Sequence, residues 1–187
     1  IGCVSFVEEL CKVTRPRNPF DLGTGTGVVA IALAKLAHVP VLASDIDPVS
    51  TRIALENARA NDVAPWIRAV TAPGFRHAEI RRRGPFDLII ANILARPLVS
   101  LAPEFPRHLE PGGRLILSGI LQSQENLVAN AMRMQGLRFL SRKRDGDWVT
   151  LLFERAPAAL PPEDLRRGRE DWFDDWLSLA RGIEFFV

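Results

Sequence analysis

Apolar runs typical of strands alternate with segments that carry apolar residues at helical spacing, from about residue 20 to residue 155. This alternation is typical of βαβ units, in which helices cover a parallel sheet. The third helical segment contains Pro103 and Pro106, which predict an irregular helix because proline removes a backbone donor. The expected strands are 41–45, 67–71, 86–91 and 114–118, and the expected helices are 28–36, 48–61, 98–109 and 122–135.

The order of elements changes near the end of this region. Residues 137–143 and 147–153 are two strand-like runs joined through Asp145-Gly146. An Asp-Gly pair between two strands is a strong hairpin signal, whereas a plain dinucleotide-binding fold would continue with another helix and a parallel strand. We therefore predict an α/β fold with a mostly parallel sheet, helices on both faces and a C-terminal antiparallel hairpin.

The chain has 187 residues, of which 47% are hydrophobic and 25% are charged. These values are typical of one globular domain, which we place at residues 1–155. Residues 156–187 are predicted to form a proline-rich linker and an amphipathic helical tail, since Trp172, Trp176 and Leu179 recur at helical spacing. The sequence leaves three alternatives for this tail: it packs against the domain, it contacts a partner or a second copy of the chain, or it is disordered.

Several classes of protein are disfavoured by the composition. No run reaches the roughly 18 apolar residues that a membrane span requires, and the start does not resemble a signal peptide, so we expect a cytoplasmic protein. Cys3 and Cys11 have no second pair and no neighbouring histidine, which argues against a disulfide framework and a metal site. The net charge of +2 is too small to favour direct nucleic-acid binding, and nothing indicates the oligomeric state.

A glycine loop is the first candidate binding site. It has the sequence Asp-Leu-Gly-Thr-Gly-Thr-Gly, and its glycines allow the backbone and the amides of the next helix to approach a ligand closely. The following strand ends in Asp45, an acid that can accept hydrogen bonds from ribose hydroxyls. We therefore predict a cofactor site at Asp21, Gly23, Gly25, Gly27 and Asp45.

Two further positions bear on the kind of ligand. Nicotinamide dinucleotides and S-adenosylmethionine both carry a ribose, but the dinucleotide fingerprint requires glycine or alanine where Val28 stands. The strand at 86–91 delivers Asn92 at its carboxyl end, where ligands of open α/β sheets bind. The carboxamide oxygen of Asn92 is an acceptor, so it can hold a substrate amine with its lone pair directed at a methyl group. Asp47, by contrast, is explained as a helix cap.

Five segments of the chain resemble the bacterial ribosomal protein L11 methyltransferase family: 21–27, 43–48, 56–58, 91–95 and 117–121. The resemblance extends from about residue 21 to residue 154. It implies a class I methyltransferase (Rossmann-like) fold and S-adenosylmethionine as the cofactor. It also implies that Gly23 and Asp45 contact this cofactor and that Asn92 lies where the methyl donor meets the substrate amine. Members of the family methylate lysine side chains and an N-terminal amine of the ribosomal protein.

Some parts of the family pattern are not found in the sequence. Residues 1–6 do not match the family's glycine- and threonine-rich cofactor loop, and its N-terminal substrate-binding domain is missing. Pro16 and Pro19 precede the glycine loop, although proline is poorly tolerated in a central strand. A methyltransferase for another protein lysine or a small molecule, and a truncated remnant that binds cofactor without turnover, are therefore alternatives.

The remaining polar and aromatic signals are weaker. Arg76 and residues 81–83 form a basic stretch that we interpret as a solvated loop, with a contact to the ribosome or an acidic partner as the alternative. Phe75 follows a strand end, where it can line an adenine pocket or belong to the core. We expect each histidine to be solvated: His38, His77 and His108.

Overall fold

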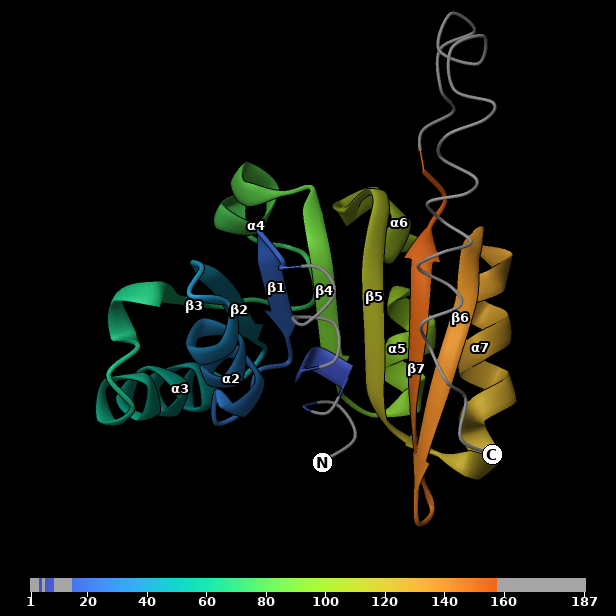
Figure 1. Cartoon of the computed structure of the whole chain (residues 1–187), viewed down its shortest axis with the longest axis horizontal. Coiled ribbons are helices and arrows are strands. Elements are labelled where there is room, and N and C mark those ends of the chain that lie inside the picture. The colour runs from blue at the N-terminus through green and yellow to red at the C-terminus, as the bar shows by residue number, and fades with distance from the viewer. Residues whose placement is uncertain (1–3, 5, 9–14, 158–187) are drawn as a thin grey trace, which may run out of the picture. The chain divides into compact units, whose positions relative to one another are not determined.

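A computed structural model describes residues 4, 6–8 and 15–157 of the chain. In this part, seven strands form one sheet in the order β3-β2-β1-β4-β5-β7-β6 (Figure 1). Strands β1 to β5 are parallel to one another, whereas β7 is antiparallel to both β5 and β6. The strands are β1 (Pro19–Leu22), β2 (Val41–Asp45), β3 (Ile67–Thr71), β4 (Phe86–Asn92), β5 (Leu109–Leu121), β6 (Leu137–Asp145) and β7 (Trp148–Arg155).

Helices cover both faces of this sheet. One face packs against α2 and α3, and the other against α4, α5, α6 and α7, so each face has its own apolar core. The predicted fold is therefore confirmed: a mostly parallel sheet, helices on both faces and a C-terminal antiparallel hairpin. The helices are α2 (Val28–Ala37), α3 (Pro48–Ala60), α4 (Ala78–Arg83), α5 (Ala95–Leu101), α6 (Phe105–His108) and α7 (Glu125–Met134), and short 3-10 turns cover residues 64–66, 102–104 and 122–124.

β1, the first strand along the chain, lies inside the sheet although it begins with a proline. It pairs with β2 on one side and β4 on the other, and all four of its residues are buried. Pro19 is the first residue of the strand, which is a position where the missing N–H does not interrupt a ladder. The expectation that the prolines disturb this strand was therefore wrong.

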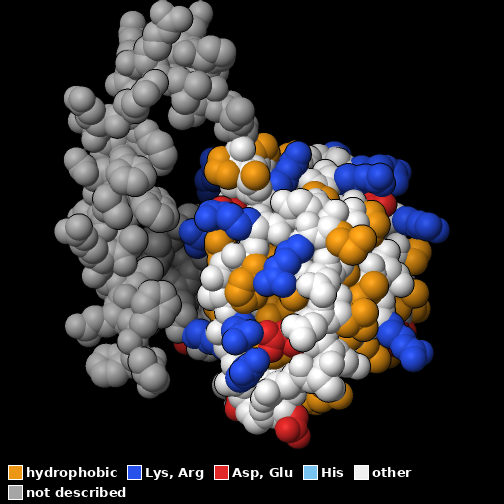
Figure 2. Space-filling model, turned by 90° about the vertical axis from the view of Figure 1, so that its right-hand side faces the viewer, with side chains coloured by type: hydrophobic (Ala, Val, Ile, Leu, Met, Phe, Trp, Pro, Cys, Tyr) orange, Lys and Arg blue, Asp and Glu red, His pale blue; other side chains and the backbone are white. Residues whose placement is uncertain are grey.

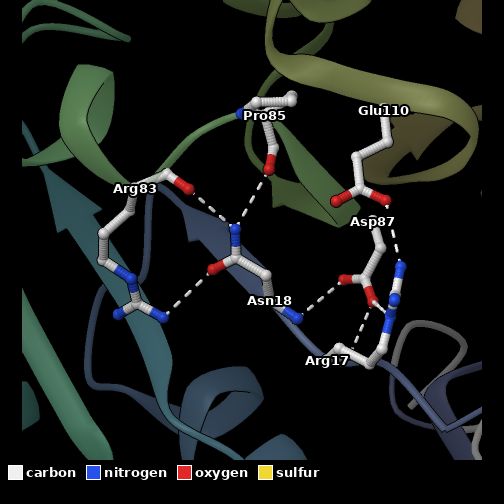
Figure 3. A network of polar contacts seen from close by, with 6 residues as sticks. All are labelled: Arg17, Asn18, Arg83, Pro85, Asp87 and Glu110. Atoms are coloured by element: carbon white, nitrogen blue, oxygen red, sulfur yellow. Dashed lines mark hydrogen bonds and ion pairs between the residues drawn. The ribbon is translucent and has the colours of Figure 1, made fainter.

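A polar network holds the start of β1 in place (Figure 3). Asn18 Nδ2 donates to the carbonyl oxygens of Arg83 and Pro85 at 2.8 and 3.0 Å. The backbone N–H of Asn18 donates to Asp87 Oδ1 at 3.0 Å, and Arg83 Nη2 donates to Asn18 Oδ1 at 3.2 Å. These bonds tie β1 to the segment that leads into β4, so the short strand is fixed by side chains as well as by its ladders.

Residues 81–83 of the basic stretch before β4 lie in a helix and not in the solvated loop that we expected, whereas Arg76 precedes this helix and is exposed. His77 caps α4, because its Nδ1 accepts a hydrogen bond from the backbone N–H of Glu79 at 3.0 Å. Arg83 lies at the end of this helix and also donates to the Pro40 carbonyl oxygen at 3.0 Å. Arg82 pairs with Glu79. This stretch was misassigned because the sequence carries no usual cap residue at its start.

The C-terminal hairpin differs from the prediction only at its turn. Asp145 pairs with Trp148 across the strands, so the two turn residues are Gly146 and Asp147 and not Asp145-Gly146. Gly146 has a φ of +55°, a conformation that glycine adopts without steric cost. The backbone N–H of Gln122 donates to the Asp147 carbonyl oxygen at 2.8 Å, which joins the turn to the end of β5.

The outer strand β6 forms one edge of the sheet and is rich in basic side chains. Figure 2 shows this side of the molecule, where Lys and Arg side chains are spread over the surface and acidic ones are few. Arg142 and Arg144 both pair with Glu125 of α7, at 2.7 and 2.9 Å, and Arg138 pairs with Glu154. Charged side chains on an edge strand disfavour pairing with other sheets.

Phe75, whose role the sequence left open, packs against His108, which we expected to be solvated. Phe75 is buried, and it contacts Phe105 edge-on with 5.5 Å between ring centroids. His108 stacks on Phe75 at 4.2 Å, and its Nδ1 lies 2.9 Å from the Glu104 carbonyl oxygen. The expectation that His108 is solvated was therefore wrong, since the ring is half-buried among aromatic neighbours. His38 is exposed at the end of α2.

The chain divides into two units, residues 1–157 and 158–187. The predicted helical tail lies almost entirely outside the described residues, as do Cys3 and Cys11, so the expectations for them stay predictions. Among the described residues, no helix has the length and apolar character needed to cross a membrane. In the same part of the chain, no three or more His, Cys, Asp or Glu residues are grouped to hold a metal ion.

Candidate functional site

A cavity of about 520 Å³ lies at the carboxyl ends of the parallel strands. This volume is within the range of small-molecule sites, and the place is where open α/β sheets bind ligands. Its walls come from the ends of β1 and β2, from the loops after β3 and β4, and from α5. Its lining includes Gly23, Ser44, Asp45, Arg76, Ile93 and Leu101.

Asp45 connects the two loops that border the cavity. Its Oδ2 accepts a hydrogen bond from the Gly25 N–H at 2.8 Å, and its Oδ1 accepts one from the Asp47 N–H at 3.0 Å. A carboxylate oxygen has two lone pairs, so each oxygen keeps one for a ligand. Asp47 itself caps α3 by accepting from the Val49 N–H at 2.9 Å, as predicted.

The three glycines of the loop have different surroundings. All have positive φ, which favours glycine. A Cβ at Gly23 would lie 2.2 Å from Ile93 Cγ2, and a Cβ at Gly27 would lie 3.1 Å from the Ala54 backbone. A Cβ at Gly25 would meet nothing within 4 Å. Gly23 and Gly27 are therefore required for packing within the protein, whereas the space over Gly25 is open to a ligand.

Asp21 is buried and faces its own loop. Its Oδ2 accepts hydrogen bonds from the Thr24 hydroxyl at 2.6 Å and from the Ala30 N–H at 3.1 Å, which ties the loop to α2. Burial raises the pKa of Asp21 from 3.8 to about 6, although these two bonds act in the opposite direction. Asp21 does not line the cavity, but it adjoins Leu22, which does.

Two buried polar atoms near the cavity lack a partner. Among the described residues, Asp21 Oδ1 and Ser44 Oγ are the buried side-chain polar atoms without a hydrogen bond. Such atoms are rare in folded proteins, because an unpaired buried acceptor is costly. Ser44 lines the cavity and its carbonyl oxygen accepts from the N–H groups of Gly23 and Thr24, both at 2.8 Å. The orphan atoms therefore indicate that donors from a ligand or water complete this site.

Asn92 is adjacent in the chain to a residue that lines the cavity but is not itself part of the lining. It is the last residue of β4, it is exposed, and its backbone is paired with that of Ser118 in β5. The next residue, Ile93, lines the cavity. Because β1 and β4 are neighbours in the sheet, Asn92 and the glycine loop are at the same edge, as the sequence predicted. The structure thus brings Gly23, Asp45 and Asn92 to one edge of the sheet. Asp21 and Gly27 do not line the cavity.

Several wall residues were not predicted. The helix after β4 begins at Ala95, three residues before the expected start, and this brings Pro97 to the cavity together with Ser100 and Leu101. Ile93 directly follows Asn92, so its position after a predicted strand was a usable signal. Arg76 also lines the cavity, whereas the sequence suggested only a surface role.

The strand order, the antiparallel β7 and the glycine loop above β1 define a class I methyltransferase fold. A solved RNA methyltransferase from Salinibacter ruber in complex with S-adenosyl-L-homocysteine shares it, at 18% identity over 85% of this chain and 93% of that chain, with a TM-score of 0.64. More specifically, the chain belongs to the ribosomal protein L11 methyltransferase (PrmA) family, whose model matches residues 1–156.

Individual relatives agree with this assignment. The ribosomal protein L11 methyltransferase of Chelativorans sp. (strain BNC1) is 53% identical over 154 residues, which is 82% of this chain and 53% of that protein. The protein of the same name from Mesorhizobium japonicum is 51% identical over 150 residues, or 80% of this chain and 52% of that protein. A solved ribosomal protein L11 methylase from Lactobacillus delbrueckii subsp. bulgaricus has 33% identity and a TM-score of 0.74, and the match covers 82% of this chain and 77% of that chain.

The family match begins at residue 1, ahead of residue 21, where the resemblance seen in the sequence begins. It ends at residue 156, close to the predicted end of the domain. The chain spans about half the length of the curated relatives it matches.

Proposed function

We propose that this chain binds S-adenosylmethionine and transfers its methyl group to amino groups of a ribosomal protein, on a lysine side chain or an N-terminal amine. The observation that carries the proposal is the hydrogen bond from the Gly25 N–H to Asp45, which lines a cavity at the carboxyl ends of the strands together with Ile93, the residue after Asn92. Family membership supports the reaction and the substrate class. A ribosomal substrate implies that the reaction takes place in the cytoplasm.

The residues of the cavity fit the parts of this cofactor. The free lone pairs of Asp45 suit the two ribose hydroxyls, which are donors. The cofactor's ammonium group is a donor as well, and Ser44 Oγ, whose residue lines the cavity, is an acceptor without a partner among the described residues. The open space over Gly25 allows a ligand to approach the backbone of the loop. We propose that Gly23 and Gly27 allow the loop to adopt this conformation.

The chemical step needs orientation more than acid–base chemistry. Bound S-adenosylmethionine supplies an electrophilic methyl group on a sulfonium. The substrate amine must be neutral, so that its lone pair forms the new N–C bond while the C–S bond breaks and one proton leaves the nitrogen. Asn92 Oδ1 is the acceptor that holds an N–H of this amine and sets the direction of its lone pair. Orientation of this kind contributes several kcal/mol, roughly 7–11 at best.

The first test is cofactor binding by the chain itself. Calorimetry is expected to show binding of S-adenosylmethionine and no binding of nicotinamide adenine dinucleotide. Asp45→Ala should weaken the affinity by about tenfold or more, since hydrogen bonds to a charged group are lost. Asp47→Ala is the matched control, because it removes a helix cap and retains the backbone N–H that bonds Asp45. Equal affinities of the Asp45 and Asp47 variants would contradict the proposed site.

The second test is transfer of tritiated methyl groups to purified ribosomal protein L11. A large decrease of the transfer rate in Asn92→Ala, with a measurable residual rate, is the expected result, and an unchanged rate in that variant would exclude the proposed role. Cofactor binding without transfer, restored when the chain is fused to the remaining half of a full-length relative, would support a catalytic domain that needs a separate substrate-binding part. Transfer only to other amines would point to a different acceptor.

A further inference from the structure

We propose that Gly119 in β5 is a positioning residue for Asn92, and that only glycine at this place allows the carboxamide to be aimed at the substrate amine. The inference rests on the proposed function, in which Asn92 holds that amine. Gly119 lies outside the cofactor cavity and has no polar side chain, so its contribution is purely geometric: it sets where the end of β4 can lie.

The backbone and side chain at the end of β4 lie directly on Gly119. A Cβ added to Gly119 would lie 2.8 Å from the Ile93 carbonyl oxygen and 3.2 Å from Asn92 Oδ1. The first distance is shorter than real Cβ contacts permit, and the atom it involves belongs to the backbone. A methyl group here must therefore displace the Asn92–Ile93 segment or β5 itself.

On its other side, the segment packs closely against the glycine loop. Ile93 Cγ2 lies 2.2 Å from the place that a Cβ of Gly23 would occupy, so the Ile93 side chain already fills the space left by the glycine loop. Gly23 and Gly119 belong to the two regions that flank the end of β4, one from β1 and one from β5. The Asn92–Ile93 segment is thus held between two glycines, each of which leaves out a side chain where the segment passes.

The position of Gly119 is itself fixed by an irregularity in β5. The pairing of β5 with β7 changes register between Leu117 and Ile120, which is typical of a β-bulge, and such bulges often redirect a side chain. Gly119 has a φ of +77° within this bulge. Ser118 hydrogen-bonds Thr150 of β7, with 3.0 Å between the two hydroxyl oxygens, and the backbone of Ser118 is paired with that of Asn92.

The chain offers a matched control for the backbone conformation. Gly112 is also in β5 and has a φ of +79°, but a Cβ there would meet nothing within 4 Å. Gly112→Ala and Gly119→Ala therefore introduce the same side chain at nearly the same φ. Only Gly119→Ala adds a contact with Asn92 and Ile93. Differences between the two variants report the contact and not the strain of positive φ.

The kinetic test compares these variants with the wild type in methyl transfer to ribosomal protein L11. We expect kcat to fall by about 10- to 100-fold in Gly119→Ala relative to Gly112→Ala, because small displacements of a reacting group have effects of this size. The dissociation constant for S-adenosylmethionine, measured by calorimetry, should differ by no more than about threefold between the two, since Asn92 acts on the acceptor. Equal kcat values in the two alanine variants would overturn the proposal.

A double-variant comparison tests whether Gly119 acts through Asn92. In an Asn92→Ala background, Gly119→Ala should change kcat by no more than about twofold, because the group that it positions is gone. A full further loss in that background would show that Gly119 acts by another route, and would contradict the inference.

A spectroscopic readout tests the same idea without catalysis. The side-chain amide signal of Asn92 in the ¹H–¹⁵N spectrum is identified by its disappearance in Asn92→Ala. It should move in Gly119→Ala and stay in place in Gly112→Ala. If Gly119→Ala does not fold, Thr150→Val, which removes the hydroxyl bonded to Ser118, should move the same signal to a smaller extent. An unmoved signal in the folded variant overturns this inference, whereas failure of the wild type to bind S-adenosylmethionine would overturn the proposed function instead.

Discussion

The Thr24 hydroxyl donates a hydrogen bond of 2.6 Å to Asp21 Oδ2, and both side chains are buried inside the glycine loop. The loop is therefore organised by its own acid before any ligand is considered. The same carboxylate accepts the Ala30 N–H of α2, so the loop and the helix that follows it are held as one unit. This arrangement lowers the stability of the folded chain by an amount that depends on pH, because ionisation of a buried carboxylate is unfavourable.

We predict that Asp21 lowers the stability of the folded chain as the pH rises. Its folded pKa of about 6 lies above the ordinary value of 3.8, so the folded state holds the proton more tightly than the unfolded state. The contribution of Asp21 to stability is therefore greatest below pH 4, falls as the pH rises to about 6 and is constant above it, with a total change of about 3 kcal/mol. The measurement is the free energy of unfolding in urea at several pH values, for wild type and Asp21→Asn. The difference, wild type minus variant, should decrease between pH 4 and 7, and a pH-independent difference would refute the assignment.

Alanine substitutions of two loop glycines, Gly25 and Gly27, should have different effects on cofactor affinity and on the stability of the chain. Gly25→Ala is expected to lower the stability by about 1 kcal/mol, which is the cost of positive φ for a residue with a side chain. Gly27→Ala should lower it further, by about 2–3 kcal/mol in total, because its Cβ also overlaps Ala54. Calorimetry with S-adenosylmethionine should show the larger loss of affinity for Gly25→Ala, over which the space is open. Thermal unfolding that ranks the two variants in the opposite order would contradict this reading of their surroundings.

The buried acid of α7 is expected to stabilise the C-terminal hairpin. Burial raises the pKa of Glu125, but hydrogen bonds from Arg144 and Arg142 lower it by more, so its net pKa is below the ordinary value. Glu125→Gln should lower the free energy of unfolding by about 1–3 kcal/mol, since a buried carboxylate loses its charge-assisted hydrogen bonds to two half-exposed arginines. This loss should shrink as the pH falls below about 4.5, because protonation of Glu125 removes the same attraction in the wild type.

The control for that change is Glu56→Gln. Glu56 pairs with Arg52 on the exposed face of α3, at 3.9 Å. Exposed pairs of this type contribute little, about 0.5 kcal/mol or less. Equal losses in the two variants, measured by urea unfolding at neutral pH, would mean that the cluster around Glu125 has no special role.

Asn18 should matter for stability and not for cofactor affinity. Asn18→Ala removes the side-chain bonds to the carbonyl oxygens of Arg83 and Pro85 and leaves both acceptors without this donor (Figure 3). The expected loss is about 2–3 kcal/mol in the free energy of unfolding. The affinity for S-adenosylmethionine should be unchanged, because Asn18 lies at the end of β1 opposite to the cavity. Arg17→Ala, which alters an exposed neighbour, should cost less than about 1 kcal/mol. A weaker affinity in Asn18→Ala with unchanged stability would contradict this division.

Much of the fold follows from local pattern. The apolar run of β3 matches the observed Ile67–Thr71 strand, and α3 begins after Asp47 as its cap and proline predict. The Asp145–Gly146 region predicts the hairpin because the turn conformation is set by adjacent residues. The glycine loop, Asp45 and the strand that ends in Asn92 could also be recognised, since each depends on short-range spacing.

Other features depend on contacts between residues that are far apart in the chain. Asp21 could not be distinguished from a ligand-facing acid, because its burial depends on how α2 packs over β1. The place of Pro19 at a strand start, and the role of His77 as a cap, likewise depend on neighbours that spacing does not reveal. Phe75 and His108 stack although they are 33 positions apart, which only the packed core brings about.

The sequence by itself thus determined the chain order of the strands and of the longer helices, the glycine loop and the acid beside it, because these are set by periodicity and by the conformations that glycine, proline and aspartate favour locally. Only the tertiary structure decided which of the candidate residues face the cavity. It also placed Gly23 and Gly119 on either side of the segment that carries Asn92, and this relation cannot be read from spacing, since it arises where three neighbouring strands end side by side.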